Sequence, residues 1–433
     1  MFRNPSNTVS ESQSLLLYHA AQLVTPIGNA LKHGKEMGKL EIIPDAAIYI
    51  EGDTIIEAGP TDILLKKYHP EKTGMESIDL TGKVIIPGFV DSHTHFVFGG
   101  YRPEEFIMRL SGAQYLDIMK MGGGIQSTVD ATKNTPAETL FSDGFKRLND
   151  MLSMGVTTVE GKSGYGLDRD CELKQLEVLN HLNREHPVDV EVTYMGAHAI
   201  PRGYPGGSDA YIDFMVKEVL PLIREKKLAR FADIFCEEGV FTPEESERYL
   251  GTCKDMGFDT KIHADEIIPL GGGELAAKTG CASADHLLAV SDRGIQMLAG
   301  SDTAATLLPC TAFCLNKPYA PARKLIDAGC AVALASDFNP GSCFTNSIPL
   351  IFSLGVIHMG MTIEEAICSL TLNGAGALKR ADTIGSIEPG KKADITVLAY
   401  PDYRFLVYHS AKNIVTLVIK NGKVCYDEAK RGV

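Results

Sequence analysis

Eight short apolar runs, separated by longer segments with a helical pattern, constrain the fold of this chain more than any other feature. Strands that alternate with helices predict βα units and a parallel sheet. The runs are continuously apolar, which is typical of strands covered on both faces. Eight units favour a closed (β/α)8 TIM-like barrel over an open sheet. The runs span residues 85–93, 156–161, 190–198, 231–237, 260–266, 283–288, 304–310 and 331–337.

Both ends of the chain show a different pattern, in which short apolar runs alternate with turn residues. Glu51-Gly52-Asp53 lies between two such runs near the N-terminus, and Asn421-Gly422 lies between two near the C-terminus. Both sequences are typical of β-hairpin turns. We therefore expect a tail over residues 1–14, a small β-sandwich domain built from 15–86 plus 387–433, and a barrel domain over 87–386.

The composition argues against a polyanionic partner. The 433 residues carry a formal net charge of -13 without a prominent run of Lys or Arg, whereas nucleic acids and anionic membranes need a basic surface. We find neither a signal-peptide core nor an apolar stretch of membrane-spanning length, and the ten scattered cysteines favour reduced thiols. We expect a cytoplasmic protein that acts on a small molecule, which can be anionic if a local cation receives it.

Polar side chains that can bind a metal or transfer a proton end most of the eight runs. In a barrel of this kind the chemistry takes place at the C-terminal ends of the strands. The chain has 12 histidines, and five of them fall at these ends. The residues concerned are His93, His95, Glu160, His198, Glu237, His263, Glu266, His286 and Asp337.

The strongest local motif is His93-Thr94-His95, which follows the first run. Residues i and i+2 of a strand point to the same face, so both imidazoles can reach one ion. His263 is the best third ligand, and Asp337 is either a fourth ligand or the base that acts on a bound water. Histidines with one carboxylate suit zinc or iron and leave a position for water. The fourth run lacks a lysine, and the nearest one, Lys162, follows the second run, so we predict a single metal ion.

Two further strand-end residues can move protons. Glu266, three residues after His263, can take a proton from the attacking water and pass it to a leaving nitrogen, although a simple salt bridge is the alternative. His286 can orient the water together with Asp337. The chemistry predicted from these residues is metal-assisted hydrolysis.

Several longer motifs resemble known enzymes. PGFVDSHTH, HADE and the ASD of the last run are similar to those of the mononuclear amidohydrolases. Within that superfamily the chain resembles the imidazolonepropionase family, and the likeness covers most of its length. It is carried by HFVFGGYRPEEF at 95–106, KSGYGL at 162–167, YMGAHAIP at 194–201, DIFCEEGVF at 233–241 and LASDFNPGS at 334–342.

The resemblance implies roles for particular residues. The metal ligands would be His93, His95, His263 and Asp337, and they would hold one zinc or iron ion in each subunit of a homodimer. Arg102 would bind the propionate of the substrate, because a guanidinium pairs with a carboxylate through two hydrogen bonds. The remaining substrate and product contacts would come from Tyr115, Tyr165, His198, Glu266, Asn339, Gly341 and Ser342.

The reaction implied by the resemblance is hydrolysis of a cyclic amide, 4-imidazolone-5-propanoate, to N-formimidoyl-L-glutamate in histidine degradation. His286 and Asp337 would help to deprotonate the water, His198 would stabilise the oxyanion, and Glu266 would protonate the leaving nitrogen. The alternative is a nucleobase deaminase of the same superfamily, which would have no use for Arg102. A non-catalytic scaffold is disfavoured, because such a protein would not need every ligand.

Overall fold

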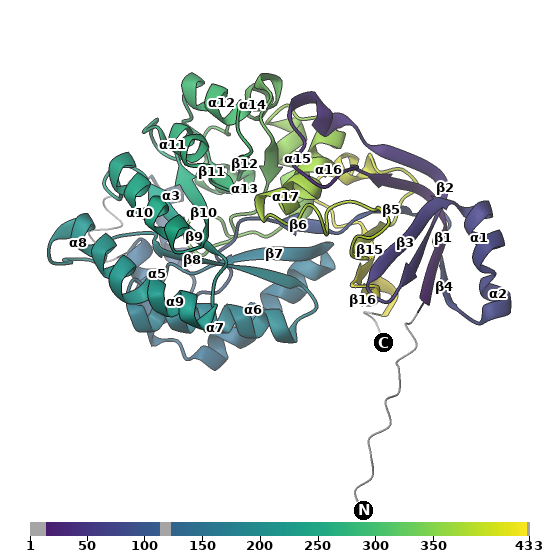
Figure 1. Cartoon of the computed structure of the whole chain (residues 1–433), viewed down its shortest axis with the longest axis horizontal. Coiled ribbons are helices and arrows are strands. Elements are labelled where there is room, and N and C mark those ends of the chain that lie inside the picture. Colours follow the sequence, from purple (N-terminus) through teal and green to yellow (C-terminus); the bar gives the residue numbers. More distant parts are fainter. Residues whose placement is uncertain (1–13, 113–122, 431–433) are drawn as a thin grey trace, which may run out of the picture.

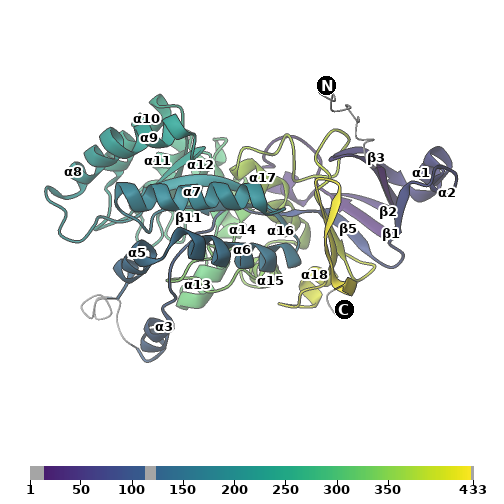
Figure 2. The same cartoon turned by 90° about the horizontal axis from the view of Figure 1, so that it is seen from below.

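The computed structural model describes residues 14–112 and 123–430. Figure 1 shows two parts, a barrel of parallel strands surrounded by helices and a separate sheet to which both ends of the chain contribute. The view in Figure 2 shows the same separation, with the second sheet at one end of the barrel. This architecture confirms the predicted fold class.

Eight parallel strands form the barrel, and their order in the sheet is their order in the sequence. They are β6 (Phe89–Asp91), β7 (Val156–Lys162), β8 (Asp189–Ala197), β9 (Phe231–Cys236), β10 (Asp259–Ala264), β11 (Ser283–His286), β12 (Ala304–Leu307) and β13 (Val332–Leu334). The residues after β6 and β13 close the barrel: the His95 amide donates to Phe338 O at 2.9 Å, and the Asp337 amide donates to His93 O at 3.0 Å. Closure therefore places two candidate ligands side by side.

The first predicted strand, 85–93, is in fact two strands in two different sheets. Val84–Pro87 forms β5 of the second sheet, and only Phe89–Asp91 belongs to the barrel. Pro87 has no amide hydrogen to continue a ladder. A Cβ at Gly88 would lie 2.3 Å from the Thr157 hydroxyl oxygen, so only glycine allows the backbone to approach β7 this closely. A continuous apolar pattern cannot reveal this change of sheet.

Helices cover the outside of the barrel strands (Figures 1 and 2). Two of them begin with a capping box, in which Thr242 and Glu245 or Thr362 and Glu365 satisfy each other's backbone amides. The helices are α3 (Pro103–Leu110), α5 (Ile125–Asn134), α6 (Ala137–Ser153), α7 (Arg169–Glu185), α8 (Gly207–Phe214), the π-helix η2 (Met215–Val219), α9 (Leu220–Lys226), α10 (Pro243–Asp255), α11 (Gly272–Thr279), α12 (Asp292–Ala299), α13 (Pro309–Leu315), α14 (Ala322–Ala328), α15 (Ile348–Ile357), α16 (Ile363–Leu370), α17 (Leu372–Ala377) and α18 (Phe405–Tyr408).

The second sheet combines strands from both ends of the chain in the order β16-β15-β14-β5-β1-β2-β3, with β4 also paired to β1. The strands, besides β5, are β1 (Ser14–Thr25), β2 (Glu41–Glu51), β3 (Thr54–Pro60), β4 (Glu76–Asp79), β14 (Ile395–Leu398), β15 (Val415–Lys420) and β16 (Lys423–Asp427). Both predicted hairpins are confirmed. In the second, Asn421 and Gly422 have φ values of 49° and 74°, as a type I′ turn requires. Short helices complete this part: η1 (Gly34–Gly38), α1 (Thr61–Tyr68), α2 (Pro70–Thr73) and η3 (Glu428–Lys430).

Hydrogen bonds join this domain into one continuous sheet, and its two halves enclose a common apolar cluster. Leu17 and Ile48 from the N-terminal segment and Ile395 and Ile419 from the C-terminal segment are fully buried in it. The pairing of β1 with β2 changes register between Leu17 and Ala20, and β1 pairs with β4 before that point and with β5 after it. We propose that this domain comprises residues 15–86 plus 387–433, as predicted from the sequence.

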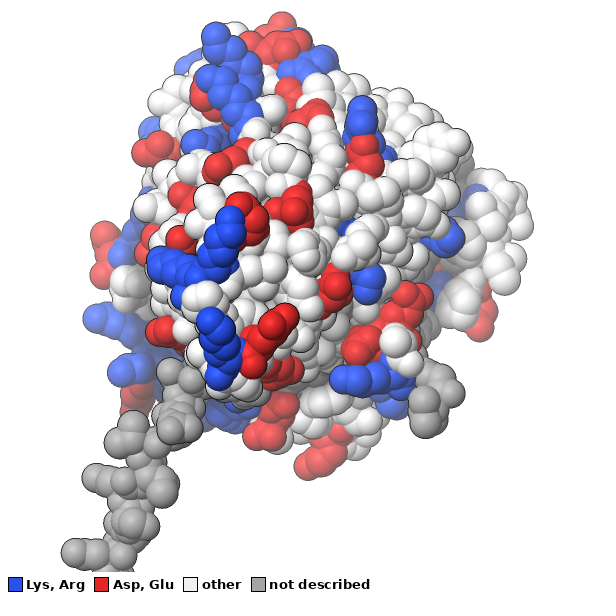
Figure 3. All heavy atoms as spheres, turned by 90° about the vertical axis from the view of Figure 1, so that its right-hand side faces the viewer, with Lys and Arg blue, Asp and Glu red and all other residues white. Residues whose placement is uncertain are grey.

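The surface and the thiols fit a globular protein. Figure 3 shows acidic and basic side chains interspersed on the face of the second sheet, without a continuous basic area among the residues drawn there. Within residues 14–112 and 123–430, we find no helix that is both long and apolar enough to cross a membrane. All ten cysteines are free, as expected for reduced thiols.

Candidate active site

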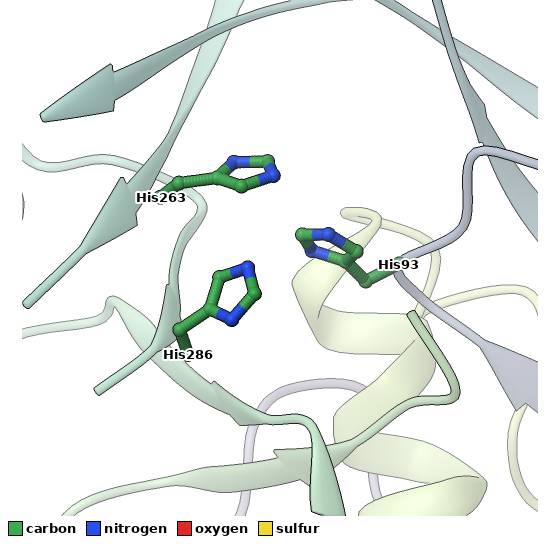
Figure 4. A group of neighbouring side chains, drawn as sticks. All are labelled: His93, His263 and His286. Atoms are coloured by element: carbon green, nitrogen blue, oxygen red, sulfur yellow. The ribbon is translucent and has the colours of Figure 1, made fainter. Parts of the chain in front are cut away.

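Histidine rings from separate strands converge at the C-terminal mouth of the barrel. His93 follows β6, His263 lies in β10, and His286 ends β11. Figure 4 shows these three rings turned toward one another, with centroids of His93 and His263 4.6 Å apart and those of His263 and His286 5.1 Å apart. All three side chains are buried. The barrel therefore gathers residues that are almost 200 positions apart in the sequence.

Two overlapping groups of side chains each bring their nitrogen and oxygen atoms close enough together to share a divalent ion. His93, His95 and Asp337 offer atoms within 4.8 Å of one another, and so do His93, His263 and His286. Oδ1 of Asp337 lies 3.5 Å from Nε2 of His93 and 3.9 Å from Nε2 of His95. Nε2 of His93 and of His263 is buried without a hydrogen-bond partner among the described residues. Buried nitrogens without partners are costly, and a metal ion would satisfy them.

Protonation also favours metal binding. Burial lowers the pKa of His93, His95 and His286 well below the ordinary value, and neighbouring positive groups lower it further. These imidazoles are therefore neutral at pH 7, as ligands must be. Burial raises the pKa of Asp337 to about 7 against the hydrogen bonds from Thr311 and Asn339, and a cation beside it would favour the charged form.

Two aspartates fix the ring orientation of the candidate ligands. Nδ1 of His93 lies 2.7 Å from Asp285 Oδ2, and Nδ1 of His263 lies 3.2 Å from the carboxylate of Asp233. An ionised carboxylate only accepts hydrogen bonds, so each Nδ1 carries the hydrogen and each Nε2 is left free for a metal. Neither aspartate was predicted from the sequence. The available signal was an acidic residue inside an otherwise apolar strand.

Unusual backbone geometry directs two of the site residues. Asp337 and His286 have φ values of 56° and 77°, although neither is glycine. Such conformations cost free energy and are found where surrounding structure enforces them, often at active sites. Asp265, also at positive φ, supports the loop after β10 by accepting hydrogen bonds from the amides of residues 270–273.

Glu266 lies beside His286 at the mouth of the barrel. Their Oε2 and Nε2 atoms are 3.6 Å apart. Burial raises the pKa of Glu266 to about 8, and the charges of Asp337 and Glu237 contribute to the rise. At neutral pH most of the Glu266 carboxyl groups therefore carry a proton that they can donate.

His198 and Tyr165 lie beside His95. The rings of His198 and His95 are stacked with centroids 4.8 Å apart, and Tyr165 is 5.4 Å from His198. Burial lowers the pKa of His198 to about 3, so this ring is neutral. A Cβ at Gly164 would lie 3.0 Å from Nδ1 of His198, so the glycine of KSGYGL makes room for the ring.

A buried glutamate that the sequence analysis missed holds the loop carrying Tyr165. Glu172, in the first turn of α7, accepts hydrogen bonds from the amides of Gly164, Gly166 and Leu167 at 2.7 to 3.1 Å. Glu172 therefore holds the backbone of the KSGYGL motif in place through these hydrogen bonds. An acid in the first turn of a helix is common, so the sequence contained no specific signal for this role.

Arg102, which we predicted to bind the substrate carboxylate, lies against the loop after β13. A Cβ at Gly341 would come 1.6 Å from Nη2 of Arg102, so the guanidinium occupies the space left by the missing side chain. Nη1 lies 3.3 Å from Glu105, and Nε is buried without a hydrogen-bond partner among the described residues. The structure thus brings together two predicted substrate residues that are 239 positions apart.

The other predicted loop contacts are differently placed. The Asn339 side chain accepts hydrogen bonds from the amides of Gly341 and Ser342, both at 2.8 Å, and its amide group donates to Asp337 O and to the Ser342 hydroxyl. Its bonds therefore stabilise the turn itself, as is common for an Asn-Pro-Gly sequence. Tyr115 lies outside the described residues.

The chain is similar to known proteins over nearly its whole length. A family model described as "Amidohydrolase family" matches residues 241–425. Imidazolonepropionase from Parabacteroides distasonis is 53% identical over 96% of this chain and 99% of its own length, and the enzyme of the same name from Clostridium tetani is 51% identical over 96% and 99%. Among solved structures, a zinc-bound adenosine deaminase from Xanthomonas campestris is 18% identical, with a TM-score of 0.70 and coverage of 96% of this chain and 94% of its own.

The closed barrel, the composite sheet and the family match define this protein as an amidohydrolase with a divalent metal site. Identity above 50% over nearly the full length of both chains then decides among the members of that superfamily. The chain belongs to the imidazolonepropionase family, as its motifs predicted.

Proposed function

We propose that this protein hydrolyses the cyclic amide of 4-imidazolone-5-propanoate to N-formimidoyl-L-glutamate, a step of histidine degradation. The observation that carries the proposal is the identity of 51% to 53% with imidazolonepropionases over 96% of the chain. The convergent histidines and the carboxyl groups at the barrel mouth provide the chemistry that such a hydrolase needs. The protein is accordingly a hydrolase of carbon–nitrogen bonds other than peptide bonds.

The proposed metal ligands are His93, His95, His263 and Asp337. A divalent ion held by these residues would supply Lewis-acid chemistry and make a water molecule nucleophilic near neutral pH. Asp337 and His286 would accept a proton from the attacking water, and the support for these roles is that both side chains lie close to His93. Zinc and iron both suit imidazole and carboxylate ligands, and we propose one ion of either metal per subunit.

Water addition to the amide carbonyl creates negative charge on its oxygen, and breaking the ring requires a proton on the departing nitrogen. The neutral His198 ring can donate an N–H hydrogen bond to that oxygen. Glu266 holds a proton at neutral pH because burial raises its pKa to about 8, so it can protonate the nitrogen as the C–N bond breaks. The neighbouring His286, 3.6 Å away, can return a proton to Glu266.

We propose that Arg102 binds the propionate of the substrate. The support is its largely buried guanidinium, with a side chain only 10% exposed, and the unpartnered Nε. A bidentate guanidinium–carboxylate pair would fix the ring over the metal. Tyr165 and Tyr115 complete the proposed substrate contacts, and Asn339, Gly341 and Ser342 those to the product. A homodimer in the cytoplasm also remains a proposal, which light scattering and cell fractionation would test.

The nucleobase deaminase is the weaker candidate. Its solved relative shares the fold at only 18% identity, and a neutral nucleobase offers no anionic group for Arg102. Purified enzyme would distinguish the two functions, since the two substrates absorb in the ultraviolet. We expect loss of the imidazolone absorbance without turnover of adenine, guanine or cytosine. Chelation should stop the reaction, and zinc or iron(II) should restore it.

A further inference from the structure

Directly behind the metal-facing histidines lies a cluster of five charged side chains that the proposed reaction does not use. All five are completely buried, and all come from barrel strands. Burial of so many charges is unfavourable unless they are closely paired. The members are Glu160 and Lys162 of β7, Asp233 of β9, Lys261 of β10 and Asp285 of β11.

The ammonium group of Lys162 lies among all three carboxylates of this charged cluster. Its Nζ is 2.6 Å from Asp233, 3.1 Å from Glu160 and 3.5 Å from Asp285. Burial acts against a charged lysine, but the three carboxylates outweigh burial and raise the pKa of Lys162, so the group is a cation. Lys261 lies to one side, 2.7 Å from Glu160 and 3.9 Å from Asp285.

The same carboxylates, together with the histidines that they orient, have spacing suited to a metal ion. His93, Glu160 and Asp285 offer ligand atoms within 4.8 Å of one another, and Asp233, His263 and Asp285 do so as well. Asp285 belongs to both groups, and its buried Oδ1 has no hydrogen-bond partner among the described residues. A second divalent ion would therefore find ligands here if the lysine did not fill the position.

We propose that the Lys162 ammonium takes the place of a second metal ion, limits the centre to one ion, and holds Asp233 and Asp285 where they orient His263 and His93. The inference rests on the proposed metal ligands of the hydrolase. Each aspartate is held by the ammonium on one side and by an imidazole Nδ1 on the other. Lys162 is thus a positioning residue, because it acts through groups that touch the ligands.

The test is the metal content of Lys162→Ala, which removes the ammonium group and leaves its position empty. After equilibration with excess zinc and removal of free ions, we expect elemental analysis to find one zinc per chain in the wild type and two in the variant. One zinc in a folded Lys162→Ala protein would overturn the proposal, as would two in the wild type. A wild type without zinc would instead reject the metal centre on which the inference rests.

Lys261→Ala is the matched control, because it removes the same charge from the cluster and leaves the Lys162 ammonium in position. We expect it to bind one zinc. If Lys261→Ala also bound two, the net charge of the cluster rather than the position of Lys162 would control the number of ions, and the proposal would be wrong.

A charge-matched double variant covers the case in which Lys162→Ala does not fold. Glu160→Gln/Lys162→Met keeps two carboxylates and one ammonium, and so keeps the single formal negative charge of the wild-type cluster. Loaded with one equivalent of zinc, it should lose that ion to a chromogenic chelator about 10- to 100-fold faster than the wild type, because the aspartates are no longer held. A wild-type rate of zinc release would contradict the positioning role.

Discussion

The candidate site has two halves, which are built on different parts of the fold. The proposed metal ligands form the metal half, and the proposed substrate residues form the substrate half. The proposed metal ligands lie in barrel strands or within four residues of their ends, and each proposed ligand is at most 2% exposed. The proposed substrate residues lie on connecting segments: Arg102 just before α3, Tyr165 between β7 and α7, and residues 339–342 after β13.

This difference separates the chemistry from the recognition of the substrate. A closed barrel fixes the proposed ligand atoms through a buried layer of carboxylates, so we expect the reactive geometry to be set before a substrate arrives. Loops can change in sequence without disturbing that layer, so the same barrel can serve other substrates. Substitutions in the metal half should therefore abolish the reaction, whereas substitutions in the substrate half should mainly raise KM.

The largest effect is expected for His93→Ala. Removal of this ligand should lower metal content to below 0.1 ion per chain and turnover by about 10³-fold or more, because the Lewis acid contributes several kcal/mol to the transition state. Elemental analysis and the ultraviolet assay on the same sample measure both quantities. Full activity in a metal-free His93→Ala protein would contradict the metal-dependent mechanism.

Glu266→Gln should separate proton transfer from metal binding. The variant keeps the size of the side chain and should keep its metal, while kcat falls by about 10²- to 10⁴-fold, the usual contribution of a general acid. KM should change little, since glutamine can still donate a hydrogen bond to the ring. Loss of the metal in this variant would show that Glu266 supports the ligands instead.

The pH dependence of the reaction provides a second test of the role of Glu266. Because burial raises the pKa of Glu266 to about 8, the carboxyl group is protonated below that pH and loses its proton above it. As the proton donor, it should cause kcat/KM of the wild type to fall above about pH 8. The alkaline decline should be absent from the residual activity of Glu266→Gln. A decline that persists unchanged must come from another group.

The convergence of the proposed metal ligands could be predicted from the sequence, whereas their role in binding a metal stays a prediction. His93-Thr94-His95, His263 and Asp337 follow recognisable apolar strands, and strand ends of a barrel meet at one mouth. The layer behind them was not predicted, since Asp233 and Asp285 show their role only when the barrel closes and brings them against histidines of neighbouring segments.

The substrate half depends on contacts for which a sequence pattern carries no signal. The meeting of Arg102 with Gly341 results from the closure of the barrel between its first and last strands. The split of residues 85–93 between two sheets was missed for a similar reason, because the close approach of Gly88 to Thr157 is a property of the packed molecule. A local sequence pattern predicts well which segments form strands and helices. Tertiary contacts decide how such a segment is divided between sheets.

A smaller effect, confined to substrate affinity, is expected for Arg102→Met. Loss of a charge-assisted pair with the propionate should raise KM by about 10- to 100-fold, with a much smaller change in kcat and no change in metal content. Arg102→Lys should recover only part of the affinity, since an ammonium cannot form the bidentate pair. An unchanged KM in Arg102→Met would remove the support for an anionic substrate tail at this position.

The smallest effect is expected for Gly341→Ala, which alters the position of Arg102 without removing its charge. The new Cβ would lie 1.6 Å from Nη2, so the guanidinium must move. Because the side chain is flexible, we expect KM to rise by less than about tenfold and kcat to stay near the wild-type value, a loss below 1.4 kcal/mol. Gly251→Ala is the matched control, since a Cβ on that residue of α10 meets no atom within 4 Å. Equal KM values for the two alanine variants would show that the contact between Arg102 and Gly341 does not position the substrate.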